Sequence, residues 1–265
     1  MKLEDFDFEL PTDLIALRPK TPRVSARLLV ATDNTIDDLL VNDLVKLLRP
    51  GDRLVLNNTK VIPARLSGTR TRTISPKNIV TAKIAINLIE RIAKDTWVAL
   101  VKPLRKLDLG EIIDLGLGLN AKITHKSNGT ATLCFNKSGQ ELDDTLNAIG
   151  SMPLPPYIEK KRSADLRDVV DYQTIWAKEP GSVAAPTASL HFDRELLTRL
   201  KRLGVTITFV TLHVGAGTFL PVKVDDISEH QMHPEIGYIS ETAATEINET
   251  KSSGNRVIPV GTTAL

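Results

Sequence analysis

Five short runs of alternating or β-branched residues occupy the middle of the sequence: KIAINLI (residues 83–89), TWVALV (96–101), EIIDL (111–115), LNAKITH (119–125) and TATLCF (130–135). A period of two is typical of strands with one buried face. Asn128-Gly129 marks a tight hairpin between the last two runs. Closely spaced strands with few helices predict a small closed β-barrel between about Leu66 and Phe135.

Helical periodicity is found on the N-terminal side of this stretch. We expect a strand at residues 27–32, a helix at 38–48 and a second strand at 53–57. Asp37 or Asp38 would cap the helix.

The alternation of helix and strand resumes on the C-terminal side. A helix at residues 193–203 precedes a strand at 205–213, and a helix at 241–251 precedes a strand at 256–260. Asp193 and Ser240 stand at the cap positions.

Together these patterns predict an α/β main domain with an inserted small β-barrel domain. The main domain would comprise residues 1–65 and 150–265, and the barrel domain residues 66–149. Two domains in tandem are the alternative.

The net charge is only +2, so a surface for a polyanion would have to come from local clusters of Lys and Arg. Aromatic residues make up 4% of the chain, which favours RNA recognition by basic side chains and shape over stacking. Each cluster could contact phosphate or simply be a solvated face. The clusters are Arg18, Lys20, Arg23 and Arg27; Arg70, Arg72 and Lys77; and Lys160, Lys161, Arg162 and Arg167.

The single cysteine, Cys134, excludes a disulfide within the chain and is most simply a small buried hydrophobe. The N-terminus lacks a signal-peptide pattern, and no apolar stretch approaches the ~18 residues that span a bilayer. We therefore expect a cytoplasmic protein without a membrane partner.

Two motifs imitate known binding sites. DLGLGLN (residues 114–120) is similar to the glycine-rich turn with which Rossmann-type methyltransferases hold S-adenosylmethionine, but the residues after it are β-like. His230 and His233 have the i, i+3 spacing that suits a metal on a helix, but they lack a clear third ligand. We expect no metal. Proton transfer, hydrogen bonding to substrate and a buried, satisfied pair remain open for these histidines.

Polar and small residues are densest between residues 179 and 219. AAPTASLHF (184–192) leads into a helix and HVGAGTF (213–219) leaves a strand, so each of these two loops carries a histidine, His191 or His213. Small residues let backbone amides approach a ligand, and histidines can move protons. Two tight turns with satisfied core histidines are the alternative reading.

Asn57, Asn58 and Thr59 follow a predicted strand, and Arg65 comes shortly afterwards. Asn side chains in this position can read a nucleoside edge or merely close a turn. Arg65 can hold a carboxylate or a phosphate with two hydrogen bonds.

The sequence resembles the S-adenosylmethionine:tRNA ribosyltransferase-isomerase family of queuosine biosynthesis through motifs that occur in order along nearly the whole chain. The motifs are DFDFELP (5–11), LNNT (56–59), PAR (63–65), MPLPPYI (152–158), YQT (172–174), VAAPTA (183–188), LHF (190–192) and TLHVGAGTF (211–219).

The resemblance implies a reaction that moves the ribosyl part of S-adenosylmethionine to the aminomethyl group of a 7-deazaguanine at the tRNA wobble position. Adenine and methionine are released, and an epoxycyclopentane remains on the tRNA. S-adenosylmethionine is then a consumed substrate and no cofactor is needed. The partner is a tRNA with a queuosine-type anticodon, and we expect a monomer.

This chemistry needs a base beside the sulfonium, an acid for the departing adenine and a dry pocket. His191 and His213 fit the proton roles by type, in either order. The alternative is that either histidine serves only to orient the nucleobase. The other residues that we expect to contact the substrates are Asn57, Asn58, Thr59, Arg65, Tyr157, Thr187, Gly215, Gly217, Thr218, Phe219, His230 and His233.

Two features depart from the family pattern. Ser189 stands where the family usually has glycine, and the family continues beyond Gly261-Thr262-Thr263, so we expect a C-terminally truncated member. The alternatives are an inactive, truncated tRNA-binding remnant and an S-adenosylmethionine-dependent RNA methyltransferase.

Overall fold

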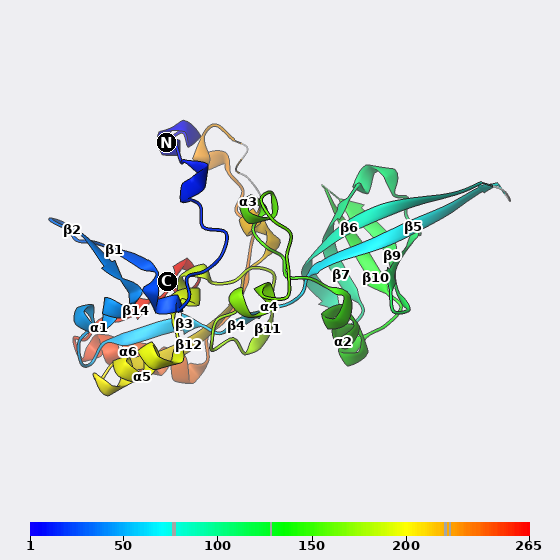
Figure 1. The fold of residues 1–265 in the computed structure, drawn as a ribbon. Helices are drawn as coiled ribbons and strands as arrows, with labels where there is room; N and C mark the ends of the chain where they lie inside the picture. The colour runs from blue at the N-terminus through cyan, green and yellow to red at the C-terminus, as the bar shows by residue number, and fades with distance from the viewer. Residues whose placement is uncertain (76–77, 128, 220–221, 223) are drawn as a thin grey trace. The chain divides into compact units, whose positions relative to one another are not determined.

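The computed structural model describes residues 1–75, 78–127, 129–219, 222 and 224–265, and the chain divides into two compact units (Figure 1). The first unit, called here the α/β unit, comprises Met1–Lys60, Pro156–Ser163 and Val170–Leu265. The second, the barrel unit, comprises Val61–Pro155 and Ala164–Val169. The predicted fold class, α/β with a small β-barrel, is confirmed.

The barrel unit contains a closed barrel in the order β10-β7-β6-β5-β8-β9, with all neighbours antiparallel. Its strands are β5 (Arg65–Ser75), β6 (Asn78–Ala93), β7 (Thr96–Lys102), β8 (Ile112–Gly116), β9 (Leu119–Ser127) and β10 (Thr130–Phe135). Ile86, Leu119, Ile123 and Leu133 are fully buried inside it, as the period-two pattern predicts. The helix α2 (Gly139–Ile149) follows the last strand.

The glycine-rich stretch at residues 114–120 is a β-hairpin. Gly116, Leu117 and Gly118 have φ angles of 85°, 48° and 70°, as a tight turn between β8 and β9 requires. No helix begins after it, so the stretch lacks the helix N-terminus that holds a phosphate or a nucleoside in Rossmann-type folds. The other predicted hairpin turn includes Asn128, which lies outside the described residues.

Cys134 is only half-buried, which corrects the prediction of a buried thiol. Along β10, Leu133 and Phe135 point into the barrel, so the alternation turns Cys134 outward. Its Sγ lies 3.7 Å from Oδ2 of Asp95.

The α/β unit is built on a four-stranded sheet in the order β13-β12-β3-β14. β3 (Arg53–Asn57) is parallel to both β12 (Thr206–His213) and β14 (Val257–Pro259), whereas β13 (Ile236–Tyr238) is antiparallel to β12. The parallel register places Asn57 beside Val210 and Val55 beside Pro259, so the carboxyl ends of β3, β12 and β14 lie at one edge of the sheet. This edge is called the carboxyl edge below.

This unit has two long helices, α5 (Arg194–Arg202) and α6 (Glu241–Ser252). They contact alternate residues of β3. Leu54 and Leu56 share a core cluster with Leu196 and Leu200 of α5. Arg53, one position away, instead bonds Glu246 and Thr250 of α6. The apolar core of this unit therefore lies mainly between β3 and α5. Each fully buried leucine in it stabilises the fold by about 2 kcal/mol.

Both helices begin where the sequence predicts. The carboxylate of Asp193 accepts a hydrogen bond from the backbone N–H of Leu196 at 2.8 Å, and the hydroxyl of Ser240 accepts one from Ala243 at 3.1 Å. Each bond satisfies a backbone donor that the first helical turn leaves free.

The predicted helix at residues 38–48 is wrong. The chain instead forms a hairpin of β1 (Arg27–Ala31) and β2 (Ile36–Leu40), and only Leu44–Leu47 is α-helical, as α1. Pairing with β1 satisfies the backbone of residues 36–40, and the apolar residues from Val41 onward then pack against the α5 core. Asp37 and Asp38 lie inside β2 and cap no helix.

Further short elements lie in the α/β unit or at its boundaries along the chain. β4 (Thr59–Val61) pairs with β11 (Glu179–Ser182), and α3 (Pro156–Glu159) and α4 (Asp168–Asp171) are single turns. Three 3-10 turns matter for the site: η6 (Thr187–His191), η7 (Ala216–Phe219) and η9 (Thr262–Ala264). No helix among the described residues is long and apolar enough to cross a membrane.

Asp52 joins the start of β3 to the start of β14. Its buried carboxylate accepts hydrogen bonds from Nε and Nη2 of Arg256 at 2.9 and 2.5 Å, and from the backbone N–H of Arg49 at 2.8 Å. The hydrogen bonds from Arg256 hold the pKa of Asp52 below its ordinary value of 3.8. The stabilisation is therefore complete above pH 3.8 and is lost as the pH falls through the lowered pKa of the folded state.

We predict that Asp52→Asn lowers the free energy of unfolding by about 2 kcal/mol at pH 7, because a charge-assisted pair is lost at a buried carboxylate while Arg256 stays partly solvated. Urea denaturation measures the change. Asp38→Asn, which breaks the exposed pair with Arg27, is the matched control and should leave the midpoint unchanged. Equal effects of the two variants would contradict a structural role for Asp52.

Candidate active site

The carboxyl edge of the parallel sheet brings together several of the polar residues that the sequence singles out. β3 ends at Asn57 and continues into Asn58 and Thr59, β12 ends at His213, and β14 is followed by Gly261. Crevices outside the carboxyl ends of parallel strands are the usual ligand sites of open α/β sheets.

Asn57 is completely buried and bonded to its neighbours. Its Nδ2 donates to the carbonyl of Leu212 at 2.9 Å, and its Oδ1 accepts from the N–H groups of Leu212 and Thr59, both at 3.1 Å. The side chain thus continues the pairing of β3 with β12 beyond the last backbone partners. These bonds hold the end of β12 and the start of β4 next to the end of β3.

Asn58 is half-buried and links three segments. Its Oδ1 accepts from the hydroxyl of Thr211 at 2.7 Å, and its carbonyl accepts from Lys178 and Glu179 at 2.8 and 3.2 Å. Trp176 donates from Nε1 to the carbonyl of Asn57 at 2.9 Å and packs edge-on against Phe192. The segment before β11 is therefore anchored at the same edge.

His213 is held on three sides. Thr59 Oγ1 lies 2.9 Å from Nδ1 of the imidazole, and the Tyr238 ring stands edge-on at 6.3 Å between centroids. Gly181 lies against the ring, since a Cβ there would be 3.0 Å from Nδ1 and Cε1. Burial lowers the pKa of His213, and the nearby carboxylate of Glu179 opposes this shift. The imidazole is thus oriented, and its neutral form is favoured.

The turn η6 is tied to the end of β14. Ser189 is fully buried and its hydroxyl donates to the carbonyl of Val260 at 3.4 Å. Gly261 has a φ of 88°, and a Cβ there would lie 3.3 Å from Cβ of Ala188. The side chain of Ser189 is therefore accommodated by its hydrogen bond to Val260, which directly follows β14.

A polar atom without a partner lies beside this contact. Among the described residues, the buried Oγ1 of Thr263 in η9 has no hydrogen-bond partner. Buried hydroxyls are normally satisfied, so an atom of this kind at the carboxyl edge favours a polar ligand there.

His191 lies at the end of η6 and is exposed, and Thr187, also exposed, begins the same turn. Although the residue as a whole is exposed, desolvation by neighbouring protein atoms and the positive charge of Arg23 lower the pKa of His191. Arg23 itself donates to the carbonyls of Gln173 and Leu190 at 2.8 and 3.2 Å, so it links η6 to the segment that contains Gln173. That His191 and His213 share one cleft stays a prediction.

Tyr172 is a buried residue that approaches the loop before η6. Burial raises its pKa to about 12, against the effect of a hydrogen bond from the backbone of Ala185. Tyr157, in α3, is about half exposed and lies close enough to Tyr172 to contribute to this shift. Tyr157 and Tyr172 are therefore electrostatic neighbours.

The loop after β12 is braced by the residues before β13. The N–H of Gly215 donates to Glu235 Oε1 at 2.8 Å. His233 packs on Gly217, because a Cβ added to this glycine would lie 2.6 Å from the Cβ of His233. Thr218 and Phe219 belong to η7 of this loop.

His230 and His233 are not on a helix, which removes the geometric basis for an i, i+3 metal pair. The 3-10 turn η8 (Ile227–Glu229) ends before them, and both histidines follow it in irregular backbone. Within the described ranges, no group of three or more His, Cys, Asp or Glu is placed to hold a metal.

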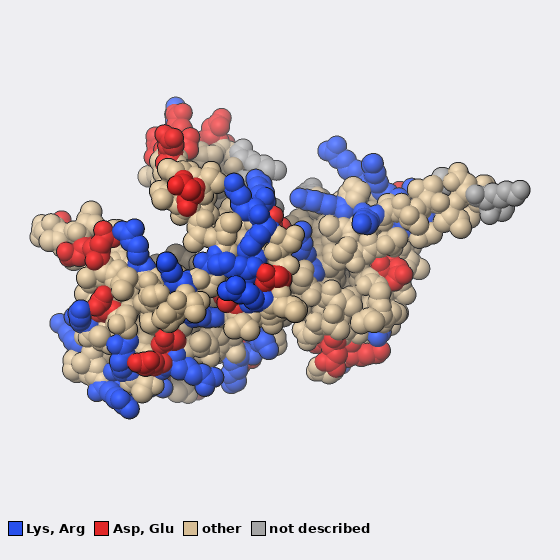
Figure 2. All heavy atoms as spheres, in the orientation of Figure 1, with Lys and Arg blue, Asp and Glu red and all other residues tan. Residues whose placement is uncertain are grey.

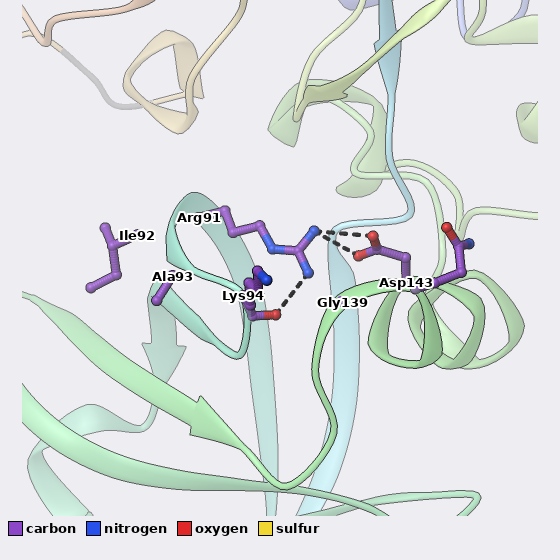
Figure 3. A pocket seen from close by; sticks show the side chains of 7 residues that line it. Arg91, Ile92, Ala93, Lys94, Gly139 and Asp143 are labelled. Carbon is purple, nitrogen blue, oxygen red and sulfur yellow. Dashed lines mark hydrogen bonds and ion pairs between the residues drawn. The ribbon is translucent and has the colours of Figure 1, made fainter.

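Arg65 begins β5 and belongs to the barrel unit. The same unit has an open hollow of about 420 Å³ between the β6–β7 turn and α2 (Figure 3). Arg91, on its wall, donates to both carboxylate oxygens of Asp143 at 2.9 and 3.0 Å and to the carbonyl of Lys94 at 2.8 Å. Because its guanidinium is occupied in this way, we place no chemistry in the hollow.

Two of the three basic clusters are largely engaged inside the protein. In the first, Arg23 bonds backbone carbonyls and Arg27 pairs with Asp38. In the second, Arg70 and Arg72 both bond Glu111, and the bond from Arg72 lowers the pKa of Glu111 to about 2. Lys77 lies outside the described residues.

The third cluster keeps Lys160 and Lys161 exposed just after α3. Figure 2 shows Lys and Arg side chains gathered over this part of the α/β unit.

Two residues of the site are not evident from the sequence. Gly181 and Tyr238 are recognised only through their contacts with His213. The Pro180-Gly181 pair is a turn signal that could have pointed to the first of them.

Comparison with known proteins places these features in one family. The family model described as queuosine biosynthesis protein matches residues 3–265. The chain is 60% identical over its full length to the S-adenosylmethionine:tRNA ribosyltransferase-isomerases of Jannaschia sp. and Ruegeria pomeroyi, and covers 74% and 76% of those proteins. It is also similar to the crystal structure of S-adenosylmethionine tRNA ribosyltransferase from Thermotoga maritima, with 29% identity and a TM-score of 0.41, over 96% of this chain and 68% of that one.

Proposed function

The chain belongs to the queuosine biosynthesis protein family, and from this premise we propose that it is an S-adenosylmethionine:tRNA ribosyltransferase-isomerase whose chemistry takes place at the carboxyl edge. The reaction transfers and isomerises the ribosyl part of S-adenosylmethionine onto the aminomethyl group of a 7-deazaguanine in the tRNA. The products are epoxyqueuosine in the tRNA, adenine and methionine. S-adenosylmethionine is consumed, so the enzyme needs no separate cofactor.

The observation that carries the proposal for the site is the environment of His213. The imidazole lies at the end of a parallel strand and is oriented by three residues. They are the buried Thr59, Gly181, which leaves room for the ring, and Tyr238, which meets the ring edge-on. Oriented histidines with a perturbed pKa are typical of functional sites. The unpartnered hydroxyl of Thr263 supports a polar ligand at the same edge.

The protein must perform three functions in this reaction. It must remove a proton beside the sulfonium, stabilise charge on the departing adenine and exclude water. His191 and His213 are proposed for the two proton-related roles. Lowered pKa values keep both imidazoles neutral at neutral pH, which suits a base or a hydrogen-bond donor.

The remaining site residues are proposed as substrate contacts. Thr187 and the loop of Gly215, Gly217, Thr218 and Phe219 offer hydroxyls, backbone amides and an aromatic ring at turns next to the strand ends. Further contacts are proposed for Asn57, Asn58, Thr59, Arg65, Tyr157, His230 and His233. Asn57 would act through the backbone that it holds, since its side chain already makes three hydrogen bonds.

For the tRNA, we propose that Lys160 and Lys161 contact phosphates, because they are exposed and the other two clusters are mostly engaged in internal bonds. A monomer in the cytoplasm is the form in which we expect the enzyme to act.

The function is tested by incubating the chain with S-adenosylmethionine and a tRNA that carries the aminomethyl-deazaguanine, and by separating the small-molecule products. Adenine and methionine in equal amounts are expected. S-adenosylhomocysteine would instead indicate an RNA methyltransferase. A non-catalytic tRNA-binding remnant would bind tRNA with a steep dependence on salt, about one log unit of affinity per log unit of salt for each phosphate contact, without turnover.

A further inference from the structure

Among the residues that the structure describes, the hydroxyl of Thr59 has a single hydrogen-bond partner. Thr59 is completely buried, so water does not reach its side chain. Its Oγ1 lies 2.9 Å from Nδ1 of His213, and the part of the chain that the structure describes offers this hydroxyl no other bond. The residues are 154 positions apart in sequence, so the contact depends on the pairing of β4 with β11 and of β3 with β12.

A hydroxyl can accept a hydrogen bond from Nδ1–H or donate one to an unprotonated Nδ1. If Oγ1 accepted, its own hydrogen would be buried without an acceptor. If Oγ1 donates, its hydrogen is satisfied and Nδ1 uses its lone pair. The second arrangement leaves no buried donor unsatisfied, and it is therefore favoured.

We propose that Thr59 is a positioning residue that holds His213 in the tautomer with the proton on Nε2. The imidazole then presents an N–H donor on the side opposite Thr59. Gly181 and Tyr238 keep the ring in this orientation, because the glycine lies against the imidazole and the tyrosine ring meets it edge-on.

The charges around His213 agree with this assignment. Glu179 on β11 is the acidic group that acts on the ring, and it is an electrostatic neighbour rather than a hydrogen-bond partner of His213. A hydrogen bond donated to Nδ1 stabilises the neutral imidazole, in the same direction as burial, which lowers the pKa of His213.

The inference rests on the proposed function and divides its proton roles. A neutral imidazole with Nε2–H cannot accept a proton at that nitrogen, so His213 serves as the hydrogen-bond donor to the departing nucleobase. The proton beside the sulfonium must then be removed by another group, for which His191 is the candidate.

The tautomer is measured directly by long-range ¹H–¹⁵N correlation spectra of the full chain at pH 7.5, without substrates. Neutral tautomers give different patterns of cross-peaks, and His213→Gln identifies the signals of this residue among the five histidines. We expect the Nε2–H pattern. An Nδ1–H pattern for His213 would overturn the proposal whether or not the chain turns over.

Variants of Thr59 test the positioning. Thr59→Val keeps the shape but removes the hydroxyl, and it should give a mixture of tautomers and a kcat about tenfold lower, with a smaller change in KM. Thr59→Ser should restore both the Nε2–H pattern and most of kcat. Thr211→Val removes a neighbouring hydroxyl that bonds Asn58 instead, and it should leave the His213 spectrum unchanged.

These outcomes separate the two claims. A His213 spectrum that stays the same in Thr59→Val would overturn the role of Thr59. The Nε2–H pattern in a native chain that releases no adenine would uphold the positioning by Thr59 while refuting the proposed function.

Discussion

Replacement of His213 by glutamine should lower kcat by a factor of about 10² to 10⁴, the range that a positioned proton-handling group contributes. Glutamine can keep a hydrogen bond to Thr59 but cannot present an imidazole N–H in the same place. The loss should appear in kcat more than in KM, because the contact strengthens as charge develops on the departing adenine.

The adenine-release assay provides the measurement, with His125→Gln as the matched control. His125 is an exposed residue on β9 of the barrel unit, and its replacement should leave turnover unchanged. If His213→Gln keeps more than about a tenth of the native kcat, His213 is not part of the chemistry.

Replacement of Gly181 by alanine should reduce kcat/KM by about a hundredfold, because the new methyl group would displace the His213 ring. Gly181 has a φ of 145°, a region that other residues rarely adopt, and the added Cβ would lie 3.0 Å from Nδ1 and Cε1 of the imidazole. The ring would have to move from Thr59 and lose its orientation.

Gly254→Ala is the control for the backbone cost alone. Gly254 also has a positive φ, of 71°, but an added Cβ there meets nothing within 4 Å. Both variants should lose some thermal stability, and only Gly181→Ala should lose activity. Equal activity of the two variants would contradict the close packing of Gly181 on His213.

The barrel could be predicted from sequence because its signal is local. Alternation along each strand places residues such as Ile86 and Leu133 inside. The helix expected at residues 38–48 failed for the opposite reason. Its alternative, pairing with β1, depends on a neighbouring strand rather than on its own pattern.

The site was less accessible to sequence reasoning. Motifs indicated His213 and Thr59 separately, but the hydrogen bond between them joins residues 154 positions apart. Basic residues such as Arg23 and Arg70 look like phosphate ligands in the sequence, yet their guanidinium groups bond protein atoms. Long-range partners of this kind leave no periodic pattern. The domain boundaries at residues 66–149 and the individual roles of the site residues stay predictions.

The most direct test of the central claim follows two isotopic labels in S-adenosylmethionine, one in the ribosyl carbons and one in the methyl group, during reaction with the aminomethyl-deazaguanine tRNA. Transfer of the ribosyl group predicts that the ribosyl label enters the tRNA while the methyl label leaves with methionine. The methyl label in the tRNA would contradict the account, as would the absence of both labels under conditions in which the Jannaschia sp. relative modifies the same tRNA.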